Sequence, residues 1–126
     1  MARFVYSKSG ENEILRAKNG MTDRHMKSLA SRIELLAKKQ VGVDTGKLRG
    51  SIHTINIHSG MPGYRIGSSN KIARLHHNGS RPHMIYAAKG KKLKISRYGT
   101  IIYREKVFHP GTKPNRYLTD PLGAVI

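Results

Sequence analysis

The chain has 126 residues, 37% of them hydrophobic and none of them cysteine, and its 24 lysines and arginines against 7 aspartates and glutamates give a net charge of 24 − 7 = +17. A chain of this length suits a single domain, and the low apolar content predicts a thin core or one that partners complete. The composition excludes disulfides and thiolate chemistry, and no apolar run approaches the roughly 20 residues of a membrane span.

The positive charge gathers in the middle of the chain. No carboxylate lies between Asp44 and Glu105, whereas the same stretch holds 12 lysines and arginines. These cations lack carboxylates to pair with, so they face either water or an external anion such as nucleic acid, an acidic lipid surface or an acidic protein. A solvated basic surface with no dedicated partner is the simplest alternative.

The first twenty residues predict an arm rather than a folded element. They are polar apart from residues 4–6 and 14–15, and Ser9-Gly10 and Asn19-Gly20 are turn signals. We expect a short strand or arm here, followed by a connector. Residues 1–6 also lack the apolar stretch of a secretory signal, which suits a cytosolic protein.

An amphipathic helix is predicted over residues 22–41. Thr22 or Asp23 is expected to cap its first turn, and Gly42 is expected to end it. Its apolar residues recur at intervals of three and four, which places them on one face of a helix. They are Met26, Leu29, Ala30, Ile33, Leu36 and Ala37.

A single helical turn, a hairpin and a short helix are expected next. Asp44 or Thr45 should cap the turn, which carries Leu48 inward. β-branched residues predict a strand over residues 52–58 that pairs with residues 64–67. The short helix is expected over residues 72–78, with an inner face and a terminating glycine formed by Ile72, Leu75, His76 and Gly79.

The remainder of the chain is dominated by extended segments. Residues 81–85 should be extended, because a proline follows their first residue. Residues 88–97 should form a strongly basic hairpin, and residues 100–108 should form a strand after a turn at Tyr98-Gly99. One closing helical turn is expected over residues 116–122, with inward side chains from Tyr117, Leu118 and Leu122.

The basic hairpin is the best candidate anion site. Residues 89–92 are its expected tip, and the alternation of a strand places Leu93 and Ile95 on one face and Lys92 and Lys94 on the other. Contacts with phosphate would depend on salt and not on base sequence. The cations of this site are Lys89, Lys91, Lys92, Lys94 and Arg97.

A metal site is not predicted. His76 and His77, together with His83 or His109, could supply imidazole ligands for zinc. However, no carboxylate stands near them to support such ligands, and adjacent histidines on a helix point in different directions.

An enzyme is not predicted either. The seven carboxylates form no pair at catalytic spacing, and no glycine-rich phosphate loop opens a helix. The strongest enzymatic alternative is a ribonuclease-type toxin that uses Arg81, His83 and Tyr86, which lie close together in the sequence. The sequence therefore predicts neither catalytic residues nor a cofactor.

Three strings in a fixed order carry a resemblance to a known family. Residues 43–52 read Val-Asp-Thr-Gly-Lys-Leu-Arg-Gly-Ser-Ile, residues 75–85 read Leu-His-His-Asn-Gly-Ser-Arg-Pro-His-Met-Ile, and residues 107–118 read Val-Phe-His-Pro-Gly-Thr-Lys-Pro-Asn-Arg-Tyr-Leu. Over residues 22–122 the chain resembles the small neck proteins of long-tailed bacteriophages, which form the tail-completion or head–tail joining family. It differs at Gly42, where proline is common, and at Ser80, where threonine is frequent.

This resemblance implies a fold and a role. It implies an α+β protein in which one long amphipathic helix packs on a small, mostly antiparallel sheet, with short helices and an extended basic hairpin. We expect a single domain over residues 21–126 behind an N-terminal arm and connector over residues 1–20. The family is not enzymatic, and the implied role is a structural ring in the virion neck, assembled in the host cytoplasm, that completes the tail tube or joins it to the head.

The implied partners are other copies of the chain, as a hexamer or dodecamer, and the adjacent connector and tail-tube proteins, with DNA possible in the lumen and no membrane. A small basic protein that binds nucleic acid without sequence preference is the alternative. We expect residues of the hairpin and of the 109–113 loop to contact subunits or anions, namely Lys89, Lys91, Lys92, Lys94, Arg97, Arg81, His83, His109, Thr112 and Lys113.

Overall fold

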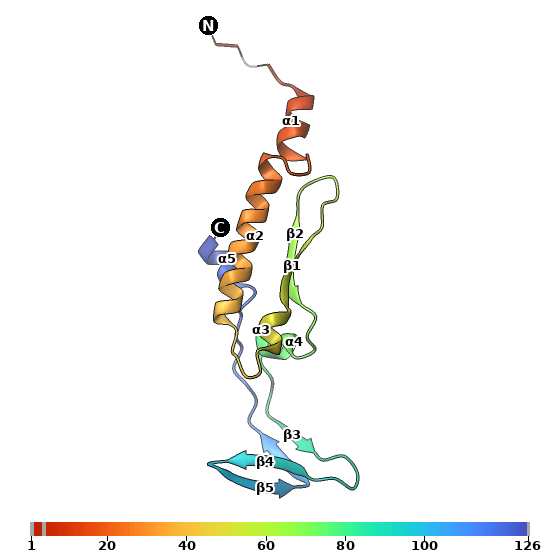
Figure 1. Cartoon of the computed structure of the whole chain (residues 1–126), viewed down its shortest axis with the longest axis vertical. Helices are drawn as coiled ribbons and strands as arrows, with labels where there is room; N and C mark the ends of the chain where they lie inside the picture. Colours follow the sequence, from red (N-terminus) through yellow and green to blue (C-terminus); the bar gives the residue numbers. More distant parts are fainter. Residues whose placement is uncertain (1, 4, 126) are drawn as a thin grey trace. The chain divides into compact units, whose positions relative to one another are not determined.

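The computed structural model describes residues 2–3 and 5–125 (Figure 1). Phe4, which belongs to the expected N-terminal strand, lies outside the described residues. The chain divides into two compact units, which are described separately here: unit 1 comprises the described residues up to 73 together with residues 116–125, and unit 2 comprises Arg74–Asn115. The expected single domain over residues 21–126 remains a prediction.

The fold is α+β, with helices and small antiparallel strand pairs. The helices are α1 Lys8–Leu15, α2 Met21–Gln40, α3 Lys47–Ser51, α4 Ala73–Asn78 and α5 Asp120–Val125. The strands are β1 Ile52–Asn56, β2 Tyr64–Ser68, β3 His83–Tyr86, β4 Leu93–Arg97, β5 Thr100–Arg104 and β6 Lys106–His109. They pair as β1 with β2, β3 with β6 and β4 with β5. None of the described helices is both long enough and apolar enough to cross a membrane.

The N-terminal segment contains a helix in place of the expected short strand, and its role as an arm and connector remains a prediction. Ser7 caps α1, because its hydroxyl accepts the backbone N–H of Gly10 at 3.2 Å. The sequence predicted a turn at Ser9-Gly10 and did not predict this cap. No residue of α1 is buried, and α1 contacts α2.

Helix α2 begins and ends differently from the expectation. Its N-cap is Gly20, with no side-chain cap, and neither Thr22 nor Asp23 takes that position. At the other end Val41 turns into the extended conformation and is buried, so the helix stops there and not at Gly42. The buried residues of α2 are Asp23, Ala30, Ile33 and Ala37.

The core of unit 1 is small. Tyr117 is fully buried, and its hydroxyl lies 3.4 Å from the carbonyl oxygen of Ala73. Burial raises the pKa of the Tyr117 phenol. The cluster brings together side chains from α2, α3, β1 and the C-terminal segment, namely Ala37, Val41, Leu48, Ile52, Ala73 and Tyr117, with Ile66 and Leu118 packed against it.

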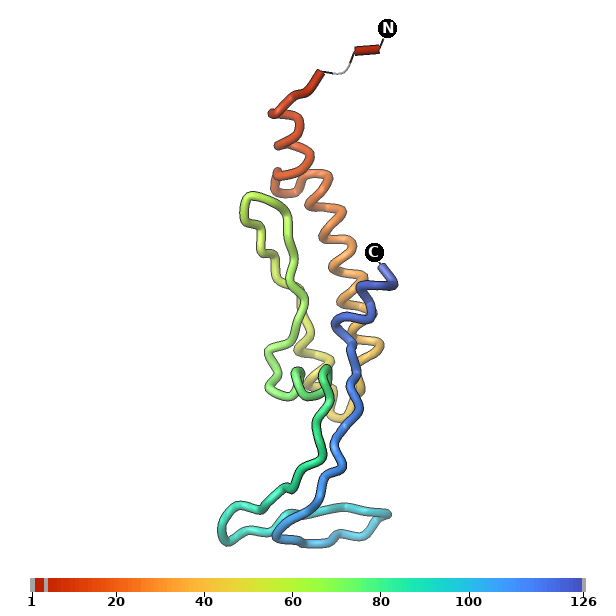
Figure 2. The backbone as a smooth tube through the Cα atoms, turned by 180° about the vertical axis from the view of Figure 1, so that it is seen from behind, coloured from red at the N-terminus to blue at the C-terminus, as the bar shows by residue number. Residues whose placement is uncertain are grey.

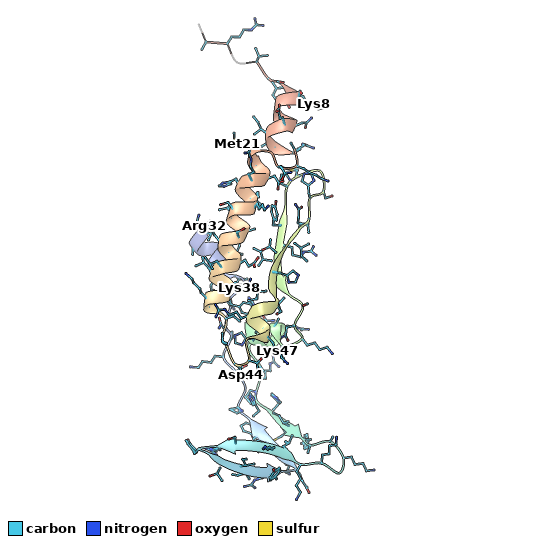
Figure 3. The ribbon with its side chains drawn as sticks, viewed as in Figure 1. Lys8, Met21, Arg32, Lys38, Asp44 and Lys47 are labelled. Atoms are coloured by element: carbon cyan, nitrogen blue, oxygen red, sulfur yellow. The ribbon has the colours of Figure 1, made fainter. Side chains whose placement is uncertain are left out.

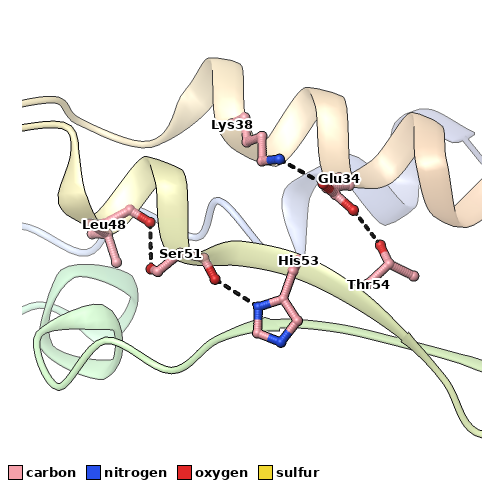
Figure 4. A network of polar contacts seen from close by, with 6 residues as sticks. All are labelled: Glu34, Lys38, Leu48, Ser51, His53 and Thr54. Atoms are coloured by element: carbon pink, nitrogen blue, oxygen red, sulfur yellow. Dashed lines mark hydrogen bonds and ion pairs between the residues drawn. The ribbon is translucent and has the colours of Figure 1, made fainter.

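The β1–β2 hairpin packs on α2 through a polar bridge as well as through the core. The strands pair antiparallel from Ile52 opposite Ser68 to Asn56 opposite Tyr64, so the hairpin expectation is confirmed. Figure 4 shows that the Glu34 carboxylate accepts hydrogen bonds from Lys38 and from the Thr54 hydroxyl, each at 2.6 Å. Lys38, first, and Thr54 hold the pKa of Glu34 below its ordinary value.

The short helices correct three further expectations. Gly46, at φ 79°, is the N-cap of α3, so neither Asp44 nor Thr45 caps it, although Leu48 is buried as expected. In α4 the buried residue is Ala73, whereas Ile72, just before the helix, and Leu75 are exposed. At the C-terminus Tyr117 and Leu118 point inward, but Leu122 is 40% exposed because the helix forms later, as α5.

A buried carboxylate joins the α1–α2 connector to the hairpin. Asp23 accepts the backbone N–H of Asn19 at 2.7 Å and the hydroxyl of Tyr64 at 2.6 Å. These bonds, the one from Tyr64 first, hold the pKa of Asp23 below its ordinary value, and Asp23 in turn raises the pKa of Tyr64. Asp23 thus stabilises unit 1 in its ionised form.

Unit 1 is therefore expected to lose stability in acid. A carboxyl whose pKa is lowered by folding contributes stability above its unfolded pKa, and this contribution is lost as the pH falls through the folded pKa. The thermal midpoint, followed by circular dichroism, should fall as the pH drops below about 4. Asp23→Asn should lower the midpoint at neutral pH and weaken its acid dependence, whereas Asp44→Asn, at an exposed carboxylate, should change neither.

Candidate functional site

Unit 2 has no hydrophobic core of its own. Every residue of Arg74–Asn115 is exposed or only half-buried. The unit nevertheless carries large apolar side chains that are exposed to solvent. They are Leu75, Met84, Ile85, Tyr86, Tyr98, Ile101, Ile102, Tyr103 and Phe108.

After α4 the unit consists of two separate strand pairs, β3–β6 and β4–β5, which together we call the ribbon; Figure 2 shows the backbone path through them. β3 pairs with β6 from His83 opposite His109 to Tyr86 opposite Lys106, and β4 pairs with β5 from Leu93 opposite Arg104 to Arg97 opposite Thr100. The strand expected over residues 100–108 is therefore interrupted, at Glu105.

The hairpin tip is not where the sequence reading placed it. The chain reverses between β4 and β5 at Tyr98-Gly99, with both residues at positive φ. Residues 89–92, the expected tip, instead lie in a side loop opposite Glu105, which we call the lysine loop and define as residues 87–92. The reason is that residues 93–97 pair with the strand after the turn, so the loop residues are left as an insertion between β3 and β4.

Both faces of the β4–β5 pair mix apolar and cationic side chains. Directly opposed residues of an antiparallel pair share a face. One face therefore carries Ile95 and Ile102 between Arg97 and Arg104, and the other face carries Lys94 and Tyr103 side by side. Figure 3 shows side chains projecting from both sides of this ribbon.

A clasp of four residues closes the base of the ribbon. Ser80 and Thr112 exchange backbone hydrogen bonds, both N–H to O at 3.1 Å, and their hydroxyls lie 3.1 Å apart. Gly79 and Gly111 flank this bridge at φ 75° and 84°. A Cβ on Gly79 would lie 2.6 Å from the Thr112 carbonyl oxygen, and one on Gly111 would overlap the Ser80 carbonyl oxygen. Only glycine fits at either position.

This clasp was not predicted, although the sequence carries a signal for it. The string Gly-Ser-Arg-Pro at residues 79–82 is echoed by Gly-Thr-Lys-Pro at residues 111–114. The two strings pair antiparallel, so each glycine faces the backbone of the other string. Of the expected contact residues, Thr112 belongs to the clasp, and Arg81 and Lys113 follow Ser80 and Thr112 directly and are exposed.

Two of the expected site residues are brought into direct contact. The rings of His83 and His109 lie 5.0 Å apart at an angle of 34°. The Nδ1 atom of His83 lies 2.8 Å from the carbonyl oxygen of Arg81 and so donates to it, whereas Nδ1 of His109 accepts the Gly111 N–H at 3.1 Å. Nδ1 of His83 therefore carries a proton and Nδ1 of His109 carries none, and each ring contacts a backbone group beside the clasp.

Comparison of the chain with family models, with curated proteins and with solved structures finds no match.

The residues considered for a ribonuclease site and for a metal site do not come together in the structure. His83 and Tyr86 lie an odd number of positions apart on β3, so their side chains leave opposite faces of the strand, and the ribonuclease trio with Arg81 does not share one face. His76 approaches Asn115, and His77 approaches Asn78. Among residues 2–3 and 5–125 no group of three histidine, aspartate or glutamate side chains is placed to hold a metal ion.

The lysines and arginines of unit 2 carry no ion pair. Within residues 74–115 there are ten lysines and arginines and one carboxylate, Glu105, so the net charge is 10 − 1 = +9. In the described part of the chain the single ion pair is Lys38 with Glu34, in unit 1. Unit 2 therefore presents unneutralised positive charge beside exposed apolar side chains.

Proposed function

We propose that this protein is a structural subunit of a bacteriophage neck, whose copies form a ring that completes the tail tube or joins it to the head connector. The observation that carries the proposal is the solvent exposure of unit 2, which has no buried residue and many exposed apolar side chains. An isolated two-stranded hairpin is only marginally stable in water. Such a ribbon gains stability when a neighbouring molecule covers it.

In the proposed subunit the two units have different roles. A long amphipathic helix, α2, packed on the small β1–β2 sheet forms the self-supporting part, and an extended basic hairpin in unit 2 forms the assembly part. The motif strings at residues 75–85 and 107–118 support this assignment, since they supply both sides of the clasp that holds the ribbon base. A closed ring requires two different complementary surfaces on each copy, and the ribbon offers one of them.

The proposed partners are further copies of the chain and the connector and tail-tube proteins on either side, with the virion neck as the place of residence and the host cytoplasm as the place of assembly. The role needs no catalytic group. The exposed apolar residues at the ribbon would lie at the centre of the contact, because the core of a protein interface is apolar and its rim is polar.

Substitution of the exposed ribbon residues should impair assembly without unfolding the protein. We expect the double variant Ile102→Ser and Phe108→Ser to weaken association with the ring neighbours more than about tenfold, because buried apolar anchors dominate interface energies. Association is measured by light scattering of the protein mixed with its head-side and tail-side neighbours, and in vivo by the yield of tailed virions.

A matched control exists in unit 1. Leu35 and Val43 are 56% and 59% exposed, against 37% and 60% for Ile102 and Phe108, so Leu35→Ser and Val43→Ser change side chains at least as exposed on average but outside the ribbon. The control pair should leave assembly unchanged. Normal virion yield from the ribbon pair, or equal impairment by both pairs, would contradict the proposed role of unit 2.

A further inference from the structure

We propose that unit 2 binds the phosphate backbone of duplex DNA through the lysine loop and the cations of the β4–β5 ribbon. The proposal rests on the proposed function in one respect, namely that the ribbon is an exposed surface of an assembling subunit. It adds the chemical class of a second partner. The first observation is the charge of +9 on a unit whose single carboxylate is Glu105.

The lysine loop has a defined shape. Its base is closed by the Ala87 N–H, which donates to the Glu105 carbonyl oxygen at 2.7 Å. A turn inside it is closed by the Lys91 N–H, which donates to the Ala88 carbonyl oxygen at 2.8 Å, with Gly90 at φ 76°. These bonds hold three lysine side chains on one short exposed loop, at Lys89, Lys91 and Lys92.

The loop borders an open hollow whose lining carries three lysines and one carboxylate, a net charge of 3 − 1 = +2. The hollow has a volume of about 360 Å³ and is lined by residues 87–92 and Glu105. None of the three ammonium groups has an ion pair or a side-chain hydrogen bond in the structure. Ammonium groups act on phosphate as compact point charges, and each phosphate neutralised releases condensed counterions from DNA.

Two features favour DNA over an acidic protein as the anion. Four of the five cations at residues 89–97 are lysines, and lysine is depleted from protein–protein interfaces whereas arginine is enriched there. A two-stranded β-ribbon is also one of the elements that the major groove of DNA admits. The β4–β5 segment has no Asn or Gln, which form bidentate contacts with adenine, and no Asp or Glu, which accept from cytosine, so we expect contacts to phosphate to dominate.

A second copy of the chain cannot supply the negative charge that the cations of unit 2 would bind. Outside residues 74–115 the chain has 24 − 10 = 14 lysines and arginines and 7 − 1 = 6 carboxylates, which leaves a net charge of +8. Both units are therefore positive, and like charges across an interface repel. Contacts between copies would therefore use the apolar side chains of the ribbon, and its cations would contact the phosphates of DNA.

The test compares two triple variants of equal net charge. Lys89→Gln, Lys91→Gln and Lys92→Gln neutralise the lysine loop, and Lys8→Gln, Lys18→Gln and Lys71→Gln neutralise three exposed lysines of unit 1. Each full-length protein is titrated into a fluorescently labelled DNA duplex of random sequence, and anisotropy is measured over a series of salt concentrations. Circular dichroism verifies that both variants keep the fold.

The expected result is a loss that is specific to the loop. Three phosphate contacts should lower the slope of log affinity against log salt by about 2.7 in the loop variant, and the unit 1 variant should lower it by less than about 1. An equal decrease in both variants would show that net charge alone drives binding. Preference for a polyglutamate peptide over duplex DNA would assign the loop to an acidic protein. Either result overturns the proposal.

The outcome separates this proposal from the proposed function. If DNA binding is not specific to the loop but the protein still assembles with its neighbours, only the phosphate site is wrong. If the loop binds DNA but the Ile102→Ser and Phe108→Ser variant assembles normally, the neck role is wrong and the phosphate site stands.

Discussion

Replacement of Ile33 by aspartate should unfold unit 1. Ile33 is 5% exposed on α2, which packs against β1, β2 and α5. An ionised carboxylate at this position would lose its hydration with no partner to replace it, and the apolar contacts of isoleucine would be lost as well. The combined loss should exceed about 4 kcal/mol, which is comparable with the whole stability of a small domain.

The same substitution two residues further along α2 provides the control. Leu35 is 56% exposed, so Leu35→Asp places its charge in water and should change the free energy of unfolding by about 0.5 kcal/mol or less. Both variants are measured by urea unfolding followed by circular dichroism. Equal stability of the two variants would show that the assigned face of α2 is incorrect.

Replacement of Gly111 by alanine should open the clasp of unit 2. Gly111 has φ 84°, a conformation that costs an L-residue roughly 1–2 kcal/mol. In addition, the new Cβ would overlap the Ser80 carbonyl oxygen and lie 3.0 Å from the Pro82 nitrogen, so the two chain segments must separate. Separation breaks the paired hydrogen bonds of Ser80 and Thr112, each of which contributes about 0.5–1.5 kcal/mol.

Gly99 separates the steric effect from the backbone effect. It has φ 79° but nothing lies within 4 Å of its Cβ position, so Gly99→Ala carries the conformational cost without the overlap. Hydrogen exchange of the Ser80 and Thr112 amides is the direct readout. Their exchange should become much faster in Gly111→Ala and stay close to that of the parent protein in Gly99→Ala; similar rates in all three proteins would refute the clasp.

The elements with local signals were found from the sequence. The Ile52 strand with its partner at Tyr64 follows from β-branched residues on either side of a glycine- and proline-rich turn, and the structure confirms the pairing. Leu48 is buried as expected, and Gly79 ends α4 at positive φ. In each case neighbouring residues decide the conformation, so the pattern is visible without the fold.

Most of the wrong predictions concern positions whose hydrogen bonds or burial depend on residues far away in the sequence. Asp23 was read as a helix cap, but it accepts a hydrogen bond from Tyr64, which is distant in sequence. Ala73 is buried in α4 because Tyr117 packs there, although Ile72 and Leu75 have the larger apolar side chains. The Ser7 cap of α1 is local and was missed because the same residues also fit a turn.

At the candidate site, too, features of single residues were predicted and features that depend on strand pairing were not. The sequence located the cations, because composition is a property of the chain itself, but the pairing of the two strings of the clasp was not predicted. It placed the hairpin tip at residues 89–92, whereas the pairing of residues 93–97 with the strand after Gly99 turned these lysines into a side loop. A register depends on which cross-strand pairs can form together, and residues 88–97 contain no partner strand of their own.

By itself the sequence determined an excess of positive charge, a small supply of apolar residues, and the local stops and turns of the chain. The tertiary structure decided which apolar residues are buried, which glycines face a neighbouring backbone, and that unit 2 has no interior. The physical reason is that charge and propensity belong to single residues, whereas burial and strand register belong to pairs that only the folded chain brings together.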